Sequence, residues 1–315
     1  MKKILCAALC LALLCGCAPA PAVRHEKPSI VTTIFPLYDW TRQLLGNQAG
    51  EVELTMLQGS GVDLHSYQPT VDDMVRLSQC DLFIYVGGES DDWVEDALQE
   101  AVNPRMRVIN LMEVLGDAVR EEETVPGMQA DPDEPGGELE YDEHIWLSLN
   151  NAFTCCSFIA QTLEAMDVIT RKDSQMDEYA GDLVDLYGAY LSAVQEASVK
   201  TLLFGDRFPF RYLTEELDLS CYAAFSGCSA ETEASFETIV FLSGKVDELN
   251  LPAVLTIEGS DGKIARTIVE NTVSKTAKVL TLDSMQSVTA EDVENGATYL
   301  GIMEQNLEVL REALQ

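Results

Sequence analysis

Residues 57–70 read LQGSGVDLHSYQPT and join two segments whose patterns together indicate the fold. A short apolar, β-branched run at 52–57 leads into this stretch, which is typical of a strand. Thr70 and Asp73 then have the spacing of a capping box, which predicts the start of a helix. The loop between strand and helix carries His65, one of only three histidines in the chain. The stretch therefore predicts a strand–loop–helix unit with a scarce metal-ligating side chain in its loop.

The same alternation of apolar runs and amphipathic segments recurs along the chain. One set of predicted strands covers residues 30–35, 52–57, 82–86 and 108–111, and a second covers 201–204, 221–225, 253–257 and 279–282. Strands separated by helices favour parallel sheets built from βαβ units. A proline-free stretch with an apolar stripe, residues 174–199, lies between the two sets and predicts one long helix. We therefore expect two α/β lobes, 29–173 and 200–315, joined by this helix; one large sheet is the alternative.

The first 17 residues indicate an export signal. A basic start, Met1-Lys2-Lys3, precedes an apolar run that is too short to span a bilayer, as in a signal peptide. The run ends in LCGC, which resembles the bacterial lipoprotein box, so Cys17 is the expected lipid-bearing residue and 18–28 its flexible tether. An ordinary cleaved signal with a chance cysteine is the alternative.

The composition restricts the classes of ligand. The formal net charge of −33 opposes binding to nucleic acid or to an anionic membrane surface, and it favours cations. Residues 120–143 are rich in acid, proline and glycine, which predicts a mobile surface loop. Outside the signal the cysteines lack zinc-ribbon spacing, although Cys221 and Cys228 could form a disulfide outside the cytoplasm.

Polar side chains stand at the ends of several predicted strands, where ligands bind in open parallel sheets. They are His65, Asp206, Glu258 and Asp283, and His144 follows the acidic loop. Two imidazoles and two carboxylates can form a four-ligand site for a divalent transition metal.

Each of these residues also has an ordinary structural interpretation. A loop histidine can simply hydrogen-bond within its loop, and an aspartate at a strand end can cap the next helix. Glu258 precedes GSDGK, where a role in a turn is as plausible as ligation. Gly59 and Gly61 would allow the tight backbone path that points His65 into a cleft.

Four segments carry a resemblance to a known family: IVTTIFPLYDWTRQLLG, GVDLHSYQPTVDDMVRLSQCDLFIYVGG, DEHIWLSLNNA and LTLDS. Together they resemble the cluster A-I solute-binding proteins, the zinc and manganese receptors of ABC importers, many of which are lipoproteins. The resemblance implies two (βα)4 lobes bridged by a rigid helix, with the metal in the cleft between them.

Within this resemblance, His65 and His144 match the two histidine ligands, and Asp283 matches the aspartate of the second lobe. The chain departs from the family in FGDRFPFRY, where Gly205 stands at a usual ligand position and Asp206 is the nearest group that could serve. The acidic loop lies where zinc-specific relatives often carry a histidine-rich loop, but it has no histidine.

We therefore expect a lipid-anchored, monomeric, non-enzymatic receptor on the outer face of the bacterial cell membrane. It would bind one Zn²⁺ or Mn²⁺, with zinc slightly favoured, and pass it to a permease driven by an ATPase. A secreted metal-dependent hydrolase is one alternative, since zinc with two histidines and a carboxylate can be catalytic, although no HExxH motif is present. A surface adhesin is the other.

Overall fold

Eight parallel strands in two separate sheets form the framework of the described part of the protein. The computed structural model describes residues 26–122, 125–128, 141–227 and 233–315, so the expected signal peptide, Cys17, most of the tether and Cys228 lie outside the described residues. The first sheet has the order β2-β1-β3-β4 and the second the order β6-β5-β7-β8. The strands are β1 Ser29–Thr32, β2 Glu53–Met56, β3 Leu82–Tyr85, β4 Arg107–Asn110, β5 Thr201–Phe208, β6 Ser220–Ser226, β7 Ala253–Ile257 and β8 Lys278–Leu282.

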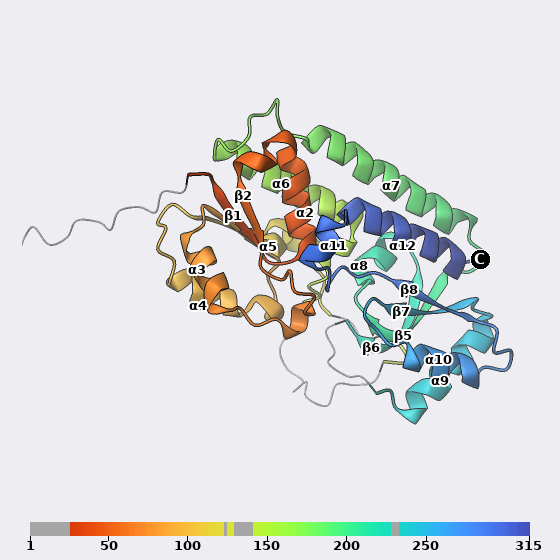
Figure 1. Ribbon diagram of the computed structural model, residues 1–315. Helices are drawn as coiled ribbons and strands as arrows, with labels where there is room; N and C mark the ends of the chain where they lie inside the picture. The colour runs from red at the N-terminus through yellow and green to blue at the C-terminus, as the bar shows by residue number, and fades with distance from the viewer. Residues whose placement is uncertain (1–25, 123–124, 129–140, 228–232) are drawn as a thin grey trace, which may run out of the picture.

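These sheets confirm the predicted α/β fold with two parallel four-stranded lobes and exclude the single large sheet. In each lobe the first strand pairs with the second on one side and with the third on the other. The loops that follow the strands face the region between the lobes, which is where the two sheets approach one another in Figure 1.

Helices follow most of the strands, and short 3-10 helices are η1 Gly46–Glu51, η2 Leu64–Ser66, η3 Glu89–Asp91, η4 Gly116–Ala118 and η5 Ile145–Leu147. The first-lobe helices are α2 Phe35–Leu45, α3 Val71–Gln79, α4 Trp93–Gln99, α5 Leu111–Leu115 and α6 Leu149–Ala165. The second-lobe helices are α8 Arg211–Glu216, α9 Phe236–Leu249, α10 Lys263–Asn271, α11 Ala290–Glu294 and α12 Tyr299–Ala313. The predicted capping box starts α3: Asp73 N donates to Thr70 Oγ1 at 3.2 Å and Thr70 N donates to Asp73 Oδ2 at 2.8 Å.

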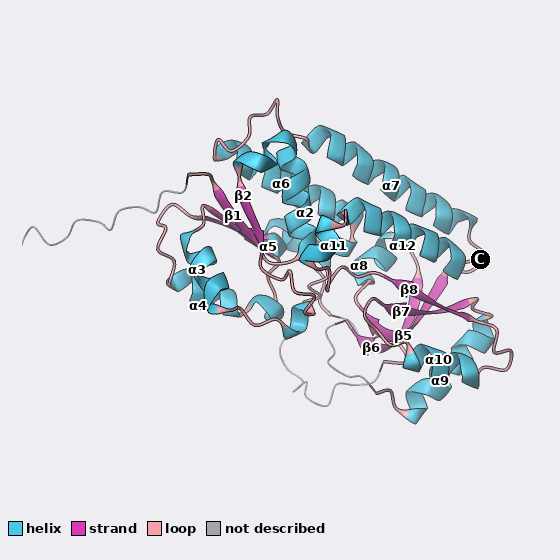
Figure 2. Ribbon diagram, in the orientation of Figure 1, coloured by secondary structure: helices cyan, strands magenta, loops and turns pink. Residues whose placement is uncertain are grey.

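The predicted long helix is α7, Met176–Glu196, which runs along one side of the molecule with α12 beside it (Figures 1 and 2). The Tyr190 hydroxyl of α7 donates to the carbonyl of Met303 in α12 at 2.6 Å. None of the helices in the described part of the chain has the length and apolar character needed to cross a bilayer.

A single cluster of buried apolar residues extends through both lobes, from Ile30 in β1 to Leu314 beside α12. Tyr299 of α12 illustrates the connection: its ring packs edge-on against Trp40 of α2 at 5.1 Å between centroids, and its hydroxyl donates to the carbonyl of Trp146 at 2.6 Å. Trp146 Nε1 in turn donates to the carbonyl of Ser284 at 2.8 Å. This shared core sets the position of one lobe relative to the other.

Candidate metal centre

The loop after β2 brings His65 to the region between the lobes. Gly61 in this loop has φ +75°, and a Cβ there would lie 2.9 Å from Cγ2 of Thr289, so only glycine fits. Gly59 has no left-handed φ, so the predicted need for glycine holds at one of the two positions. Asp63 then caps η2 by accepting the His65 amide proton on Oδ1 at 3.1 Å.

The His65 imidazole has a defined partner at each ring nitrogen. Nδ1 hydrogen-bonds with Ser90 Oγ at 2.9 Å, and the Ser90 amide donates to Glu143 Oε1 at 2.7 Å. Nε2 lies 3.3 Å from Nε2 of His144. Ser90 and Glu143 therefore fix the outer edge of the ring and leave its inner edge directed at His144.

The His144 imidazole is fully buried. The Asp142 Oδ1 oxygen accepts both its Nδ1–H and its backbone amide, each at 2.8 Å. Gly227, in the turn after β6 of the other lobe, approaches so closely that a Cβ there would lie 2.9 Å from Cε1 of the ring. His144 is therefore held by its own segment on one side and by the second lobe on another.

The two inner nitrogens have the spacing that a shared metal requires. Zinc bound to two imidazole nitrogens at about 2.0–2.1 Å in tetrahedral geometry would hold them roughly 3.3 Å apart. The observed Nε2–Nε2 distance is 3.3 Å. Metal-bound histidines usually have the other ring nitrogen anchored by a carboxylate or another polar partner, as Asp142 and Ser90 do here. The histidine pair fits a transition metal.

The electrostatics of the two imidazoles allow the histidine pair to bind one extra proton and disfavour a second. Burial, followed by the charge of His144, lowers the pKa of His65 to about 3. Burial would also lower the pKa of His144, but the charge and hydrogen bond of Asp142 outweigh it and raise that pKa. His65 is therefore neutral at physiological pH, as a metal ligand must be.

A cavity of about 750 Å³ opens between the lobes beside the pair and is lined by His65, Asp206 and Glu258 among other residues. The Asp206 Oδ1 oxygen accepts the amide proton of Arg207 at 2.9 Å. Its Oδ2 oxygen is buried and accepts no hydrogen bond from the described residues. Since a buried carboxylate oxygen without a partner is costly, Asp206 has the free acceptor that a ligand needs.

Glu258 and Asp283 lie together at the ends of β7 and β8. Both carboxylate oxygens of Glu258 accept hydrogen bonds. They accept from the amides of Ser284 at 2.7 Å and Gln286 at 3.0 Å and from the Ser284 hydroxyl. Burial and the charge of Asp283 raise the pKa of Glu258 to about 7. Asp283 accepts the Met285 amide at 2.8 Å, and burial raises its pKa also.

The structure thus brings the two predicted histidines together and places Asp206 on the same cavity. Asp283 lines an adjoining hollow that also includes Glu258. In the residues that the structure describes, no three histidine, cysteine, aspartate or glutamate side chains are close enough to form a complete metal shell. The sequence analysis missed the residues that hydrogen-bond around the two histidines, which are Asp63, Ser90, Asp142 and Glu143. The repeated Asp-x-His spacing of DLH and DEH could have indicated the two aspartates.

The described ends of the acidic segment 120–143 lie against the second lobe. Glu121 and Tyr141 form an isolated antiparallel bridge, and Glu122 accepts the Gly227 amide at 3.1 Å. The Tyr212 hydroxyl accepts from the Arg120 amide at 3.0 Å and donates to the Asp142 carbonyl at 2.7 Å. The segment therefore begins and ends beside His144, while residues 129–140 lie outside the described residues. So does Cys228, which leaves the predicted disulfide with Cys221 open.

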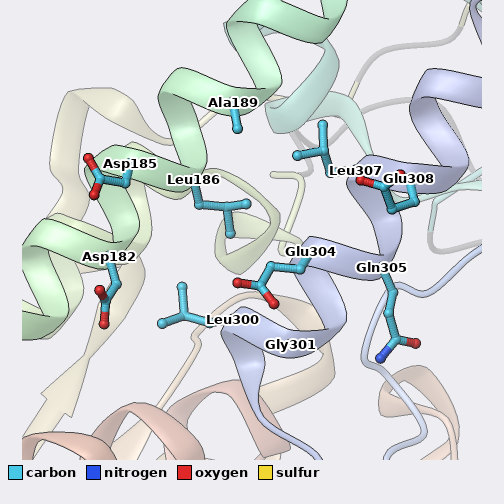
Figure 3. Close-up of a pocket in the computed structure, with 10 residues that line it drawn as sticks. All are labelled: Asp182, Asp185, Leu186, Ala189, Leu300, Gly301, Glu304, Gln305, Leu307 and Glu308. Carbon is cyan, nitrogen blue, oxygen red and sulfur yellow. The ribbon is translucent and has the colours of Figure 1, made fainter.

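A second hollow of about 860 Å³ lies between α7 and α12 (Figure 3). Its lining has four carboxylates, from Asp182, Asp185, Glu304 and Glu308, but no imidazole or thiol. Figure 3 shows that these carboxylates point in different directions and do not converge on one point. The hollow lacks the features of a metal centre.

Two α/β lobes with facing histidines at their cleft define the class of solute-binding proteins for transition metals. Comparison with known proteins gives the family. The family ZnuA, described as zinc-uptake complex component A, periplasmic, matches residues 30–313, and the chain belongs to it. This is a family of transport components and not of enzymes.

Curated relatives agree with this assignment. The chain is 30% identical over 324 residues to the zinc-binding lipoprotein AdcA of Streptococcus pneumoniae strain R6, covering 99% of this chain and 61% of that protein. It is 25% identical over 293 residues to the high-affinity zinc uptake system protein ZnuA of Bacillus subtilis, covering 92% of this chain and 89% of that one. The chain therefore spans about three fifths of the length of the AdcA relative.

Solved structures confirm the fold. The laminin-binding protein of Streptococcus agalactiae superposes with a TM-score of 0.73 at 24% identity, covering 91% of this chain and all of that one. The Zn(II)-bound AdcA of Streptococcus pneumoniae superposes with a TM-score of 0.68 at 26% identity, covering 91% of this chain and 58% of that one.

Proposed function

We propose that this protein captures one divalent transition metal outside the cytoplasm and delivers it to an ABC importer. The observation that carries the proposal is the approach of His65 Nε2 to within 3.3 Å of His144 Nε2. Membership of a zinc-uptake family supports the transport role. The metal is cargo in this role and undergoes no chemistry.

We propose that His65, His144, Asp206 and Asp283 form the metal shell. The spare buried oxygen of Asp206 supports its inclusion, because a cation would give that oxygen the partner it lacks. Asp283 is the family's second-lobe aspartate by resemblance, and it lines the hollow that adjoins the cavity beside the histidines. Glu258 supports that loop through its hydrogen bonds to Ser284.

Zinc is the metal we favour. Two imidazoles suit Zn²⁺, and the Irving–Williams order gives zinc a higher affinity than manganese at such a site. The AdcA and ZnuA relatives carry zinc in their names, and the AdcA structure contains it. Manganese is the second candidate, because the proposed shell contains two carboxylates. A competition titration between the two ions would decide which metal binds more tightly.

We propose that a lipid on Cys17 holds the protein at the outer face of the membrane, where a permease and its ATPase accept the metal from a monomer. The lipoprotein name of the AdcA relative supports the anchor. A multiply acylated cysteine should anchor stably. If Cys17→Ala stayed in the membrane fraction as strongly as the unmodified protein, the anchor proposal would be wrong.

The experiment that tests metal capture is a thermal melt with and without zinc. Zinc at a thousandfold excess over its dissociation constant should add about 4 kcal/mol to the unfolding free energy at pH 7.5. The His65→Ala variant should lose most of this gain and keep its metal-free melting temperature, because the ring lies in a loop beside the cavity. A lower metal-free melting temperature with an intact zinc shift would instead show a structural histidine.

The hydrolase alternative makes a different prediction about the metal shell. A catalytic zinc keeps one position open for water, whereas four protein ligands exclude it. Counting the waters on the bound metal in a crystal structure of the zinc-loaded protein therefore separates the two functions.

A further inference from the structure

Arg207 places a permanent positive charge in the cleft that is proposed to receive a metal cation. It lies at the end of β5, where the strand's register with β6 shifts between Phe204 and Arg207. Its side chain lines the cleft together with His65 and Asp206. A cation at this position would repel the metal unless another group neutralised it.

The neutralising group comes from the other lobe. The Arg207 guanidinium donates to Asp63 Oδ2 at 2.6 Å, across 144 positions of sequence. The two side chains are 18% and 27% exposed, so the pair is largely withdrawn from water.

Asp63 has a second bond, which connects this ion pair to the metal ligand. Its other oxygen, Oδ1, accepts the His65 amide at 3.1 Å and caps η2. One carboxylate therefore holds the backbone of His65 with one oxygen and the second lobe with the other. Displacement of either partner would move the short helix that carries the imidazole.

We propose that Asp63 and Arg207 form an interlobe positioning pair that holds His65 at the metal and sets the affinity of the site. This inference rests on the proposed function. Without Arg207, Asp63 would lose its anchor on the second lobe, and the His65 loop would gain freedom. Without the Asp63 charge, an unpaired guanidinium would remain beside the bound dication. Loss of either side chain therefore lowers the metal affinity of the site, and both losses act through the same Asp63–Arg207 contact.

The test is a double-mutant cycle on zinc affinity. Asp63→Asn keeps a good N-cap for His65 and removes the charge, whereas Arg207→Gln removes the guanidinium. Each variant should raise the zinc dissociation constant about tenfold, and the double variant should do no worse than either, which corresponds to a coupling of about 1.4 kcal/mol. Arg207→Lys should recover much of the affinity, because it retains the charge.

Two further measurements separate positioning from a general loss of structure. Glu215→Gln is a matched control, because it removes a cross-lobe ion pair with Arg120 (3.3 Å) that does not contact the His65 loop. This variant should bind zinc as the wild type does. The visible spectrum of bound Co²⁺ reports the ligand geometry, and it should change in Asp63→Asn and Arg207→Gln but not in Glu215→Gln.

The outcomes are distinguishable. Two results would overturn the positioning pair and leave metal capture intact. One is wild-type zinc affinity in both single variants. The other is a hundredfold loss of affinity in the double variant, because two tenfold effects would then be independent. An equal loss in Glu215→Gln would also overturn it, because any cross-lobe tie would then suffice. A wild-type protein that bound no zinc would overturn the proposed function and the pair with it.

Discussion

Asp206 and Glu258 both follow strands of the second sheet, yet their carboxylates are bonded differently. Glu258 accepts two backbone amides and a hydroxyl, while one Asp206 oxygen is buried without a partner among the described residues. We therefore expect Asp206→Ala to weaken zinc binding by at least about 100-fold, because the loss of a ligand should cost more than the loss of a group that only supports one. Isothermal titration would measure this loss.

Glu258→Ala is the matched variant for that prediction. It should leave zinc binding largely intact and lower the unfolding free energy by roughly 1–3 kcal/mol, because buried amides lose their acceptor. Equal losses of zinc affinity in the two variants, or the reverse order, would contradict the assignment of Asp206.

The histidine pair predicts how proton release accompanies metal binding. The pKa of His65 is lowered to about 3, so this ring is already neutral, whereas Asp142 raises the pKa of His144. The proton on His144 stabilises the fold below its unfolded pKa of about 6.5, and this contribution is lost as pH rises through the raised folded value. Zinc must displace any proton on His144, so its affinity falls as pH falls, and the proton that the pair releases comes from His144.

The Asp142→Asn variant tests this account. Without the carboxylate, the pKa of His144 falls, and the ring is neutral before zinc arrives. Calorimetry at pH 6.5 in buffers of different ionisation enthalpy should show fewer protons released than in the wild type. Identical proton release would place the titrating group elsewhere.

At the scale of elements, the turn after β6 closes one side of the site. Gly227 stands against the His144 ring, where a Cβ would also lie 3.1 Å from the carbonyl of Phe208. Gly227→Ala should push the ring from its place and weaken zinc binding at least tenfold, a loss typical of displaced supporting groups. Competition with a chromophoric chelator would measure it.

The control for that variant is Gly244→Ala in the middle of α9, where a Cβ meets nothing within 4 Å. This change should leave zinc affinity unchanged and raise the unfolding free energy by up to about 1 kcal/mol, because alanine favours the helix. If both glycine variants bound zinc equally well, close packing of Gly227 on His144 would be irrelevant to the site.

At the scale of the whole molecule, the shared core limits how far the lobes can move. Tyr299 joins α12 to Trp40 of the first lobe and to Trp146 beside His144, and Tyr190 joins α7 to α12. We expect zinc to change the radius of gyration by less than about 1 Å, as in preorganised complexes. Small-angle X-ray scattering of zinc-loaded and metal-free protein checks this, and a larger compaction would show a hinge.

Much of the fold could be predicted because its signals are local. Apolar β-branched runs indicated all eight strands, and Thr70 and Asp73 indicated the start of α3. A proline-free amphipathic stretch indicated α7. Strand and helix preferences depend on neighbours a few residues away, so a single sequence contains them.

The candidate site was only partly predictable, because the sequence indicated its candidate ligands but not the residues that hydrogen-bond to them. His65 was suggested by its scarcity and by its position after a predicted strand, and His144 by its scarcity and by its position after the acidic loop. Ser90 and Glu143, which orient His65, carry no local signal of that role. Glu258 also hydrogen-bonds to Ser284 and Gln286 only because the fold places the loops after β7 and β8 side by side.

By itself, the sequence determined the class of fold and the order of its elements, and it indicated the candidate metal ligands. Only the tertiary structure decided which of these residues meet: His65 and His144 are 79 positions apart in sequence, and Asp63 and Arg207 are 144 apart. The physical reason is that hydrophobic periodicity and capping act between near neighbours. The meeting of His65 and His144 depends on how distant segments of the first lobe pack together, and the pairing of Asp63 with Arg207 depends on how the shared core places one lobe against the other.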